Sequence, residues 1–326
     1  MRRTAVLAVL AFLPSFCWAQ GPEPAQVTGL PRSEPLPQPV ELKPEAPPLL
    51  RSFGAPDLTA AAHQDELELR SAAALVIDQE DGQLLYAKNT DAVMPIASIT
   101  KLMSAIVVLD AGLPLEETIT IDREDMDYIK GTRSKLKVGT TLTRRQLLRL
   151  ALMASENRAA AALARTYPGG TQAFVQAMNQ KARQLGMRDT HFRDSTGLDA
   201  ANVSTAMDLA LLVNAGYHYP LIREFSTTES YRLAFEGARR HRMLAFRNSN
   251  GLVRSGEWEI GLQKTGYISE AGRCLVMQAR IATRPVIIVL LDSWGKFTRI
   301  ADANRIKRWM ESFHPMSAVP RRVRMG

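Results

Sequence analysis

The sequence is poor in cysteine and in aromatic residues, and it has no long uninterrupted apolar segment. Its two cysteines are Cys17 and Cys274. Loss of an N-terminal leader would leave Cys274 alone, which excludes an internal disulfide. Cys274 begins the apolar stretch 274–277, where a cysteine is typical of a core. No dense basic patch is interleaved with aromatic side chains, so we expect no nucleic-acid partner.

The N-terminus has the pattern of a secretory signal. Arg2 and Arg3 precede an apolar core at 5–16, and Cys17-Trp18-Ala19 leads to a predicted cleavage after Ala19, so residues 1–19 are interpreted as a signal peptide. The alternative, a membrane anchor, is disfavoured because the apolar run is shorter than the roughly 20 residues that a bilayer requires.

Composition then divides the rest of the chain into three parts. Residues 21–49 hold nine of the 18 prolines, so 20–64 is predicted to be a disordered linker. The globular domain is expected at 65–313, and 314–326 is a basic tail without an apolar face. Loss of Arg2 and Arg3 with the signal peptide would lower the formal charge from +8 to +6, and this positive charge would favour an acidic polymer as a partner.

Hydrophobic periodicity predicts strands at both ends of the globular domain and helices between them. The expected elements are strands 71–77 and 83–87 joined by a turn, a mostly helical block 113–218, a strand-like region from about Arg223 with strands at 258–264, 273–282 and 285–291, and a closing helix 297–313. This order favours an α+β fold, in which helices flank an antiparallel sheet and an all-helical subdomain lies beside it.

A serine and a lysine stand three residues apart where an apolar helix begins, at Ser98 and Lys101. Residues i and i+3 share a helix face, so the amine can reach the hydroxyl. An amine with a lowered pKa can activate a serine nucleophile. Ser-x-x-Lys also occurs at Ser134 and Ser293, in a polar loop and after a strand, and we interpret both as chance matches.

Two further short motifs follow along the chain. Ser155-x-Asn157 interrupts a helical region, and either catalysis or helix capping explains a serine and an asparagine there. Lys264-Thr265-Gly266 is placed at the end of an apolar strand, where it is either functional or a simple strand end.

The three motifs, in this order and context, resemble the penicilloyl-serine superfamily of penicillin-binding proteins and serine β-lactamases. Residues 94–101, 194–199 and 202–205 are similar to the low-molecular-mass DD-peptidases of the peptidase S11 family, and the resemblance covers about residues 65–313. It implies a β-lactamase/transpeptidase-like fold, a periplasmic location, peptidoglycan peptides as substrate and β-lactam antibiotics as covalent inhibitors.

The resemblance also implies the roles of the motif residues. Ser98 would form an acyl-enzyme with Lys101 as base, and Ser155 would pass the proton to the leaving nitrogen. Asn157 would orient Lys101 and the substrate amide. The remaining expected substrate-binding residues are Lys264 and Thr265 for a carboxylate, Gly266 for an extended peptide, and Tyr267, which with Ser98 supplies the N–H groups of an oxyanion hole. No metal or other cofactor is expected.

Several activities of the superfamily remain open at this point. A class A β-lactamase would need a Glu-x-x-Leu-Asn segment, and no glutamate between Asn157 and Lys264 fits it. The lack of an amphipathic anchor after Phe313 resembles the subgroup of D-alanyl-D-alanine endopeptidases, which cleave D-alanyl–diaminopimelate cross-links. D-alanyl-D-alanine carboxypeptidase is the alternative, and a binder without turnover is disfavoured because every motif position is intact.

Overall fold

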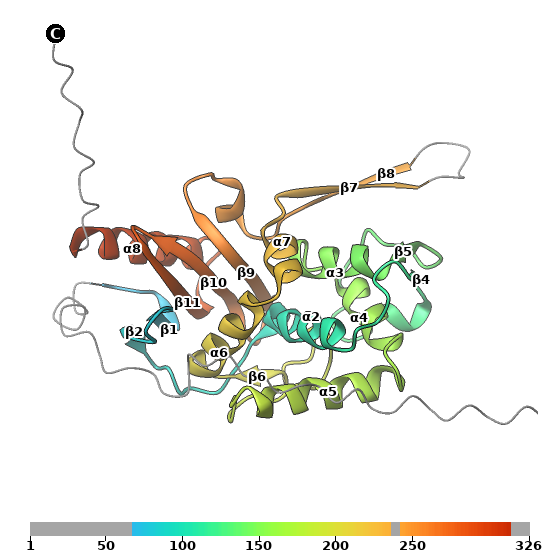
Figure 1. Ribbon diagram of the computed structural model, residues 1–326, viewed down its shortest axis with the longest axis horizontal. Helices are drawn as coiled ribbons and strands as arrows, with labels where there is room; N and C mark the ends of the chain where they lie inside the picture. Colours follow the sequence, from blue (N-terminus) through green and yellow to red (C-terminus); the bar gives the residue numbers. More distant parts are fainter. Residues whose placement is uncertain (1–66, 236–241, 314–326) are drawn as a thin grey trace, which may run out of the picture. The chain divides into compact units, whose positions relative to one another are not determined.

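The computed structural model describes residues 67–235 and 242–313 (Figure 1). The predicted signal peptide 1–19, the linker 20–64 and the basic tail 314–326 lie outside the described residues. Within the described ranges, no helix combines the length and the apolar character that a membrane span would require.

One five-stranded antiparallel sheet forms the framework, in the order β2-β1-β11-β10-β9. Its strands are β1 (Ser71–Asp78), β2 (Leu84–Lys88), β9 (Glu259–Ile268), β10 (Gly272–Ile281) and β11 (Arg284–Ser293). The first strand of the domain pairs with the last, with Ala74 opposite Leu290. The predicted antiparallel sheet built from both ends of the domain is therefore confirmed.

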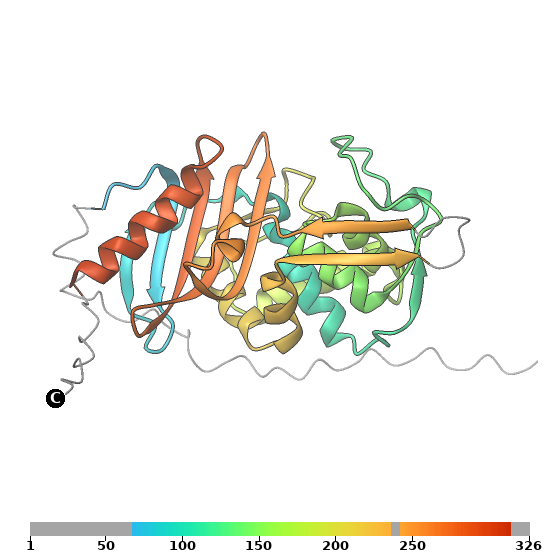
Figure 2. The ribbon, with the colours of Figure 1, turned by 90° about the horizontal axis from the view of Figure 1, so that it is seen from above.

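The strands alternate their side chains between two apolar layers, as the pleat requires. On β1, Leu75 and Ile77 contribute to the larger core, while Ala74 and Val76 pack with α8 (Thr298–Phe313). Figure 2 shows α8 lying across its face of the sheet. The predicted stripe of this closing helix is confirmed: all its members contribute to that layer, namely Ile300, Ala303, Ile306, Trp309 and Met310.

Most of the helical block lies at the β9 edge of the sheet, while the helix Ala206–Tyr217 packs across the sheet face opposite α8, against β1, β9, β10 and β11 (Figures 1 and 2). Its helices are α2 (Thr100–Asp110), α3 (Arg144–Met153), α4 (Asn157–Arg165), α5 (Gly170–Gln184), α6 (Ala206–Tyr217) and α7 (Pro220–Thr227). Short strand pairs interrupt the block or flank it: β4 (Thr118–Thr120) with β5 (Thr141–Thr143), β3 (Met94–Pro95) with β6 (Val203–Ser204), and β7 (Ser230–Phe235) with β8 (Arg242–Arg247).

Local sequence signals explain where several helices begin. The capping box at Thr143 and Gln146 is present at the start of α3, and Thr205 caps α6 by accepting a hydrogen bond from the Asp208 N–H. The strand-like region expected from Arg223 is wrong at its start, because α7 continues to Thr227. Pro220 opens that helix at a position where its missing N–H has no cost.

Candidate active site

Ser98 lies in a tight turn that the chain holds in a fixed conformation. The 3₁₀ turn η2 (Ala97–Ile99) precedes α2, and Ala97 has a positive φ of 48°. The Ala97 carbonyl accepts a 2.8 Å hydrogen bond from the Thr100 hydroxyl. Gly197 passes so close that a Cβ there would lie 1.9 Å from the Ala97 oxygen. The turn is therefore fixed from both sides, and Ser98 remains partly exposed.

The Lys101 amine is fully buried and directed at the Ser98 hydroxyl. Its Nζ lies 2.9 Å from Ser98 Oγ, 2.7 Å from Asn157 Oδ1 and 2.6 Å from the Thr196 carbonyl oxygen. The predicted approach of Lys101 to Ser98 is thus present in the structure.

These three contacts determine where the protons of Lys101 can go. A protonated amine has three N–H donors, whereas a neutral amine has two donors and one lone pair. The amide oxygen of Asn157 and the carbonyl oxygen of Thr196 can only accept. When Lys101 is neutral, its two N–H bonds are directed at those oxygens and the lone pair faces the Ser98 hydroxyl, which can then donate.

Burial also favours the neutral amine. It lowers the pKa of Lys101 to about 7, because the charged form loses its hydration. The carboxylates of Asp194, Glu156 and Asp127 oppose this shift. A large fraction of Lys101 is therefore a free base near neutral pH.

Ser155 faces a second buried lysine. It occupies the turn between α3 and α4 with a positive φ of 58°, and its Oγ lies 2.9 Å from Lys264 Nζ. Lys264 also donates to the Thr265 carbonyl at 2.8 Å. Burial, and to a lesser extent the cations of Lys101 and Arg299, hold the pKa of Lys264 well below its usual range. An arriving carboxylate would supply the missing counter-charge and favour the ammonium.

Asn157 is the first residue of α4 and bridges two parts of the site. Its oxygen accepts from Lys101, and its Nδ2 donates to the Thr132 hydroxyl at 2.9 Å. Thr132 is in turn bound to Asp127 through both its N–H and its hydroxyl. Sequence reasoning missed Thr132, because the loop that carries it has no motif and meets Asn157 only in the folded chain.

The sequence prediction placed Lys264-Thr265-Gly266 at a strand end, and this is wrong. All three residues lie inside β9, which continues to Ile268 because its ladder with β10 runs on to Gly272. A Cβ on Gly266 would lie 2.8 Å from the Ile96 oxygen and 3.2 Å from the Ser98 nitrogen. Glycine at this position lets β9 lie directly against the Ser98 turn, a requirement of packing that the sequence did not reveal.

Two cations flank the end of this strand. Tyr267 is 56% exposed and its ring stacks on Arg273, with 4.4 Å between the guanidinium carbon and the ring centroid. Arg299 of α8 donates to the Gly266 carbonyl at 3.2 Å. Arg299 was also missed by sequence reasoning, because a helix far along the chain brings it to β9.

The Thr196 carbonyl that receives Lys101 belongs to a loop built around Asp194. Its carboxylate accepts from the backbone N–H groups of Thr196, Gly197 and Asp199. Asn202 ties this loop to the turn that carries Ser98, since its Nδ2 donates to the Thr100 hydroxyl at 3.0 Å. In the sequence, residues 194–199 were singled out only by their similarity to the DD-peptidases.

The two other Ser-x-x-Lys matches lie in different surroundings. Ser293 at the end of β11 shares a 2.7 Å hydrogen bond with Ser71, whose hydroxyl donates to Asp302 of α8. Ser134 donates to the buried Glu156 carboxylate. Across the described ranges, no hydrogen bond joins either serine to the lysine three residues later.

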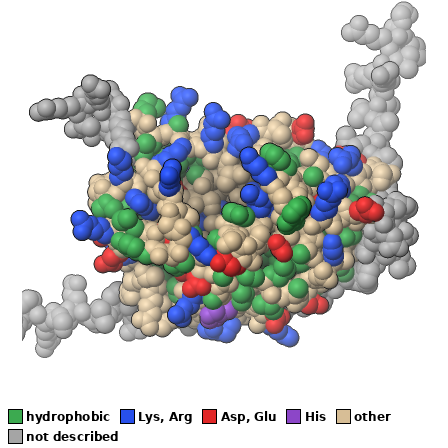
Figure 3. All heavy atoms as spheres, turned by 180° about the vertical axis from the view of Figure 1, so that it is seen from behind, with side chains coloured by type: hydrophobic (Ala, Val, Ile, Leu, Met, Phe, Trp, Pro, Cys, Tyr) green, Lys and Arg blue, Asp and Glu red, His purple; other side chains and the backbone are tan. Residues whose placement is uncertain are grey.

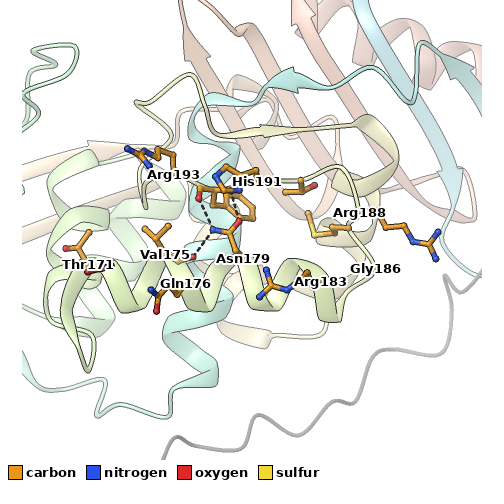
Figure 4. Close-up of a pocket in the computed structure, with 13 residues that line it drawn as sticks. Thr171, Val175, Gln176, Asn179, Arg183, Gly186, Arg188, His191 and Arg193 are labelled. Carbon is orange, nitrogen blue, oxygen red and sulfur yellow. Dashed lines mark hydrogen bonds between the residues drawn. The ribbon is translucent and has the colours of Figure 1, made fainter.

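A large cavity lies away from these residues. It has a volume of about 1040 Å³ between α5 and the segment 186–193, and Asn179 braces that segment through two hydrogen bonds with the backbone of Phe192 (Figure 4).

Within residues 67–235 and 242–313, no group of three or more His, Cys, Asp and Glu side chains is arranged to hold a metal ion. Seen from behind, lysine and arginine side chains are frequent over the upper part of the surface (Figure 3).

A partly exposed serine beside a buried lysine, where an antiparallel sheet meets a helical block, defines a serine peptidase of the β-lactamase/transpeptidase-like fold. Residues 59–295 match the peptidase S11 family, described as D-alanyl-D-alanine carboxypeptidase, and the chain belongs to this family. The family and the fold class that the sequence predicted are confirmed.

Proteins similar to this chain belong to the same class of enzyme. A D-alanyl-D-alanine endopeptidase of Pseudomonas aeruginosa is 50% identical over 253 residues, which cover 78% of this chain and 81% of the relative. One of Escherichia coli is 46% identical with the same coverage. The Streptomyces K15 DD-transpeptidase structure has a TM-score of 0.70 and 30% identity, covering 75% of this chain and 98% of that one.

Proposed function

We propose that this chain is a periplasmic DD-endopeptidase that hydrolyses D-alanyl–diaminopimelate cross-links of peptidoglycan through an acyl-enzyme on Ser98. The observation that carries the mechanism is the buried Lys101 amine at 2.9 Å from the Ser98 hydroxyl, with its other two donors committed to acceptor-only oxygens. The assignment of endopeptidase specificity rests on two relatives, 50% and 46% identical to this chain, that are named endopeptidases.

Acylation begins when neutral Lys101 takes the proton of Ser98 as its oxygen attacks the D-alanyl carbonyl carbon. The developing oxyanion is stabilised by the backbone N–H groups of Ser98 and Tyr267. Expulsion of the amine requires a proton on the leaving nitrogen, and Ser155 supplies it and recovers one through Lys264. Water then hydrolyses the ester by the same steps in reverse.

Substrate is held from both sides of the scissile bond. Lys264 and Thr265 bind the carboxylate beside the leaving nitrogen, and Asn157 orients the amide on the acyl side. A diaminopimelate D-centre and a terminal D-alanine both present that carboxylate, so these contacts serve an endopeptidase and a carboxypeptidase equally. The carboxypeptidase is the second candidate, because the matched family is described by that activity.

The deciding experiment compares two reactions of the purified protein. We expect release of monomers from dimeric cross-linked muropeptides to exceed release of free D-alanine from monomeric pentapeptide. Free D-alanine as the main product, with dimers surviving, would contradict the endopeptidase assignment and leave the Ser98 mechanism intact.

The stability of the penicilloyl ester distinguishes a β-lactamase from a DD-peptidase. The chain lacks the Glu-x-x-Leu-Asn segment that activates the deacylating water in class A enzymes. We expect a penicillin adduct that persists long after a peptide acyl-enzyme has turned over. Rapid multiple turnover of penicillin would instead favour a β-lactamase.

A further inference from the structure

A basic cavity lies beside the turn that carries Ser155, where it is lined by Ala154 and Glu156. Its volume is about 570 Å³, and it lies between the loop 131–139 and the hairpin β7–β8. The lining residues are Arg133, Ser134, Lys135, Ala154, Glu156, Ala245, Phe246 and Arg247.

The cavity is joined to the site at two points. Ala154 and Glu156 flank Ser155 in the turn between α3 and α4. On the opposite wall, Arg247 is two residues before Ser249, whose hydroxyl shares a 2.7 Å hydrogen bond with Thr265. Ser155 and Thr265 both act on the leaving-group half of the scissile bond, so the cavity lies on that half.

Positive charge dominates the lining. Arg133 and Arg247 are exposed, and no ion pair or hydrogen bond of either guanidinium occurs in the part of the chain that the structure describes. Lys135 is fixed across the cavity by a 2.7 Å hydrogen bond to the Ala245 carbonyl and lies over the Phe246 ring. The single acid is Glu156, which is buried and bonded to Ser134, and burial raises its pKa.

We propose that this cavity is a subsite for an anionic leaving peptide, with Arg133 and Arg247 binding carboxylates beyond the one held by Lys264 and Thr265. The proposal rests on the endopeptidase function. Cross-link hydrolysis expels a whole stem peptide, which carries glutamyl and C-terminal carboxylates. A carboxypeptidase expels only D-alanine, whose one carboxylate is already bound by Lys264.

The test uses the double variant Arg133→Gln/Arg247→Gln, with Arg183→Gln/Arg188→Gln as a control that removes the same charge at exposed positions beside the remote α5 cavity. The ratio of kcat/KM for cross-linked dimer to that for pentapeptide should fall roughly 3- to 20-fold, from two partly exposed charge contacts. The difference should shrink at high salt. The control pair should keep the wild-type ratio.

A second measurement separates this proposal from the proposed function. Free tetrapeptide stem is used to inhibit labelling by fluorescent penicillin, and its inhibition constant should rise by a similar factor in the double variant. An unchanged constant would overturn the subsite even if dimers are cleaved. A raised constant in a protein that leaves dimers intact would support the subsite and overturn the endopeptidase function.

Discussion

The acylation rate of Ser98 should rise with pH through neutrality, because the proposed base is the neutral form of Lys101. With a pKa of about 7, roughly a tenth of Lys101 is neutral at pH 6 and about nine tenths at pH 8. The second-order rate constant for acylation by a penicillin should therefore increase about tenfold across this interval and then level off.

The direction of this pH dependence follows from the cause of the pKa shift of Lys101. Burial lowers the pKa of Lys101 from its ordinary value of 10.5, so the amine loses its proton inside the physiological range. If the pKa were ordinary, the rate would still be climbing tenfold for each pH unit at about pH 9. The position of the plateau therefore reports burial of the amine.

Stopped-flow labelling with a fluorescent penicillin between pH 5.5 and 9.5 measures this profile. The variant Lys101→Met supplies the comparison, and should lower the rate by about 10²- to 10⁴-fold and remove the rise with pH. A wild-type profile that is flat, or that falls through neutrality, would refute the assignment of Lys101 as base.

Further substitutions test the other parts of the site. Ser98→Ala should abolish penicillin labelling, whereas Ser134→Ala and Ser293→Ala should retain it, as gel fluorescence would show. Labelling of the Ser98→Ala variant would show that another residue is the nucleophile. Lys264→Ala should lower kcat/KM by roughly 10- to 150-fold, since a charge-assisted carboxylate contact is worth about 1.5–3 kcal/mol. A decrease of less than twofold in kcat/KM for peptide hydrolysis would show that Lys264 does not bind the substrate carboxylate. Gly266→Ala should slow acylation and lower the melting temperature, because the added methyl would lie 2.8 Å from a backbone oxygen; wild-type values of both would show that the strand can shift freely.

The sequence determined the features that depend on neighbours along the chain. Capping at Thr143 and Thr205 and the apolar stripe of the closing helix are local signals, and each appears as expected. The reach of Lys101 to Ser98 also follows from short separation, since one helical turn brings the two side chains together.

Only the tertiary structure decided which distant groups complete the site. The Thr196 carbonyl, the Thr132 hydroxyl and Arg299 come from separate segments, and no pattern along the chain marks them as the hydrogen-bond partners of Lys101, Asn157 and Gly266 respectively. The lowered pKa of Lys101 is likewise a property of enclosure, because it arises when the folded chain excludes water from the amine. Even Gly266 has its packing role from β9 lying against the Ser98 turn, a contact that forms only when the sheet meets the helical block.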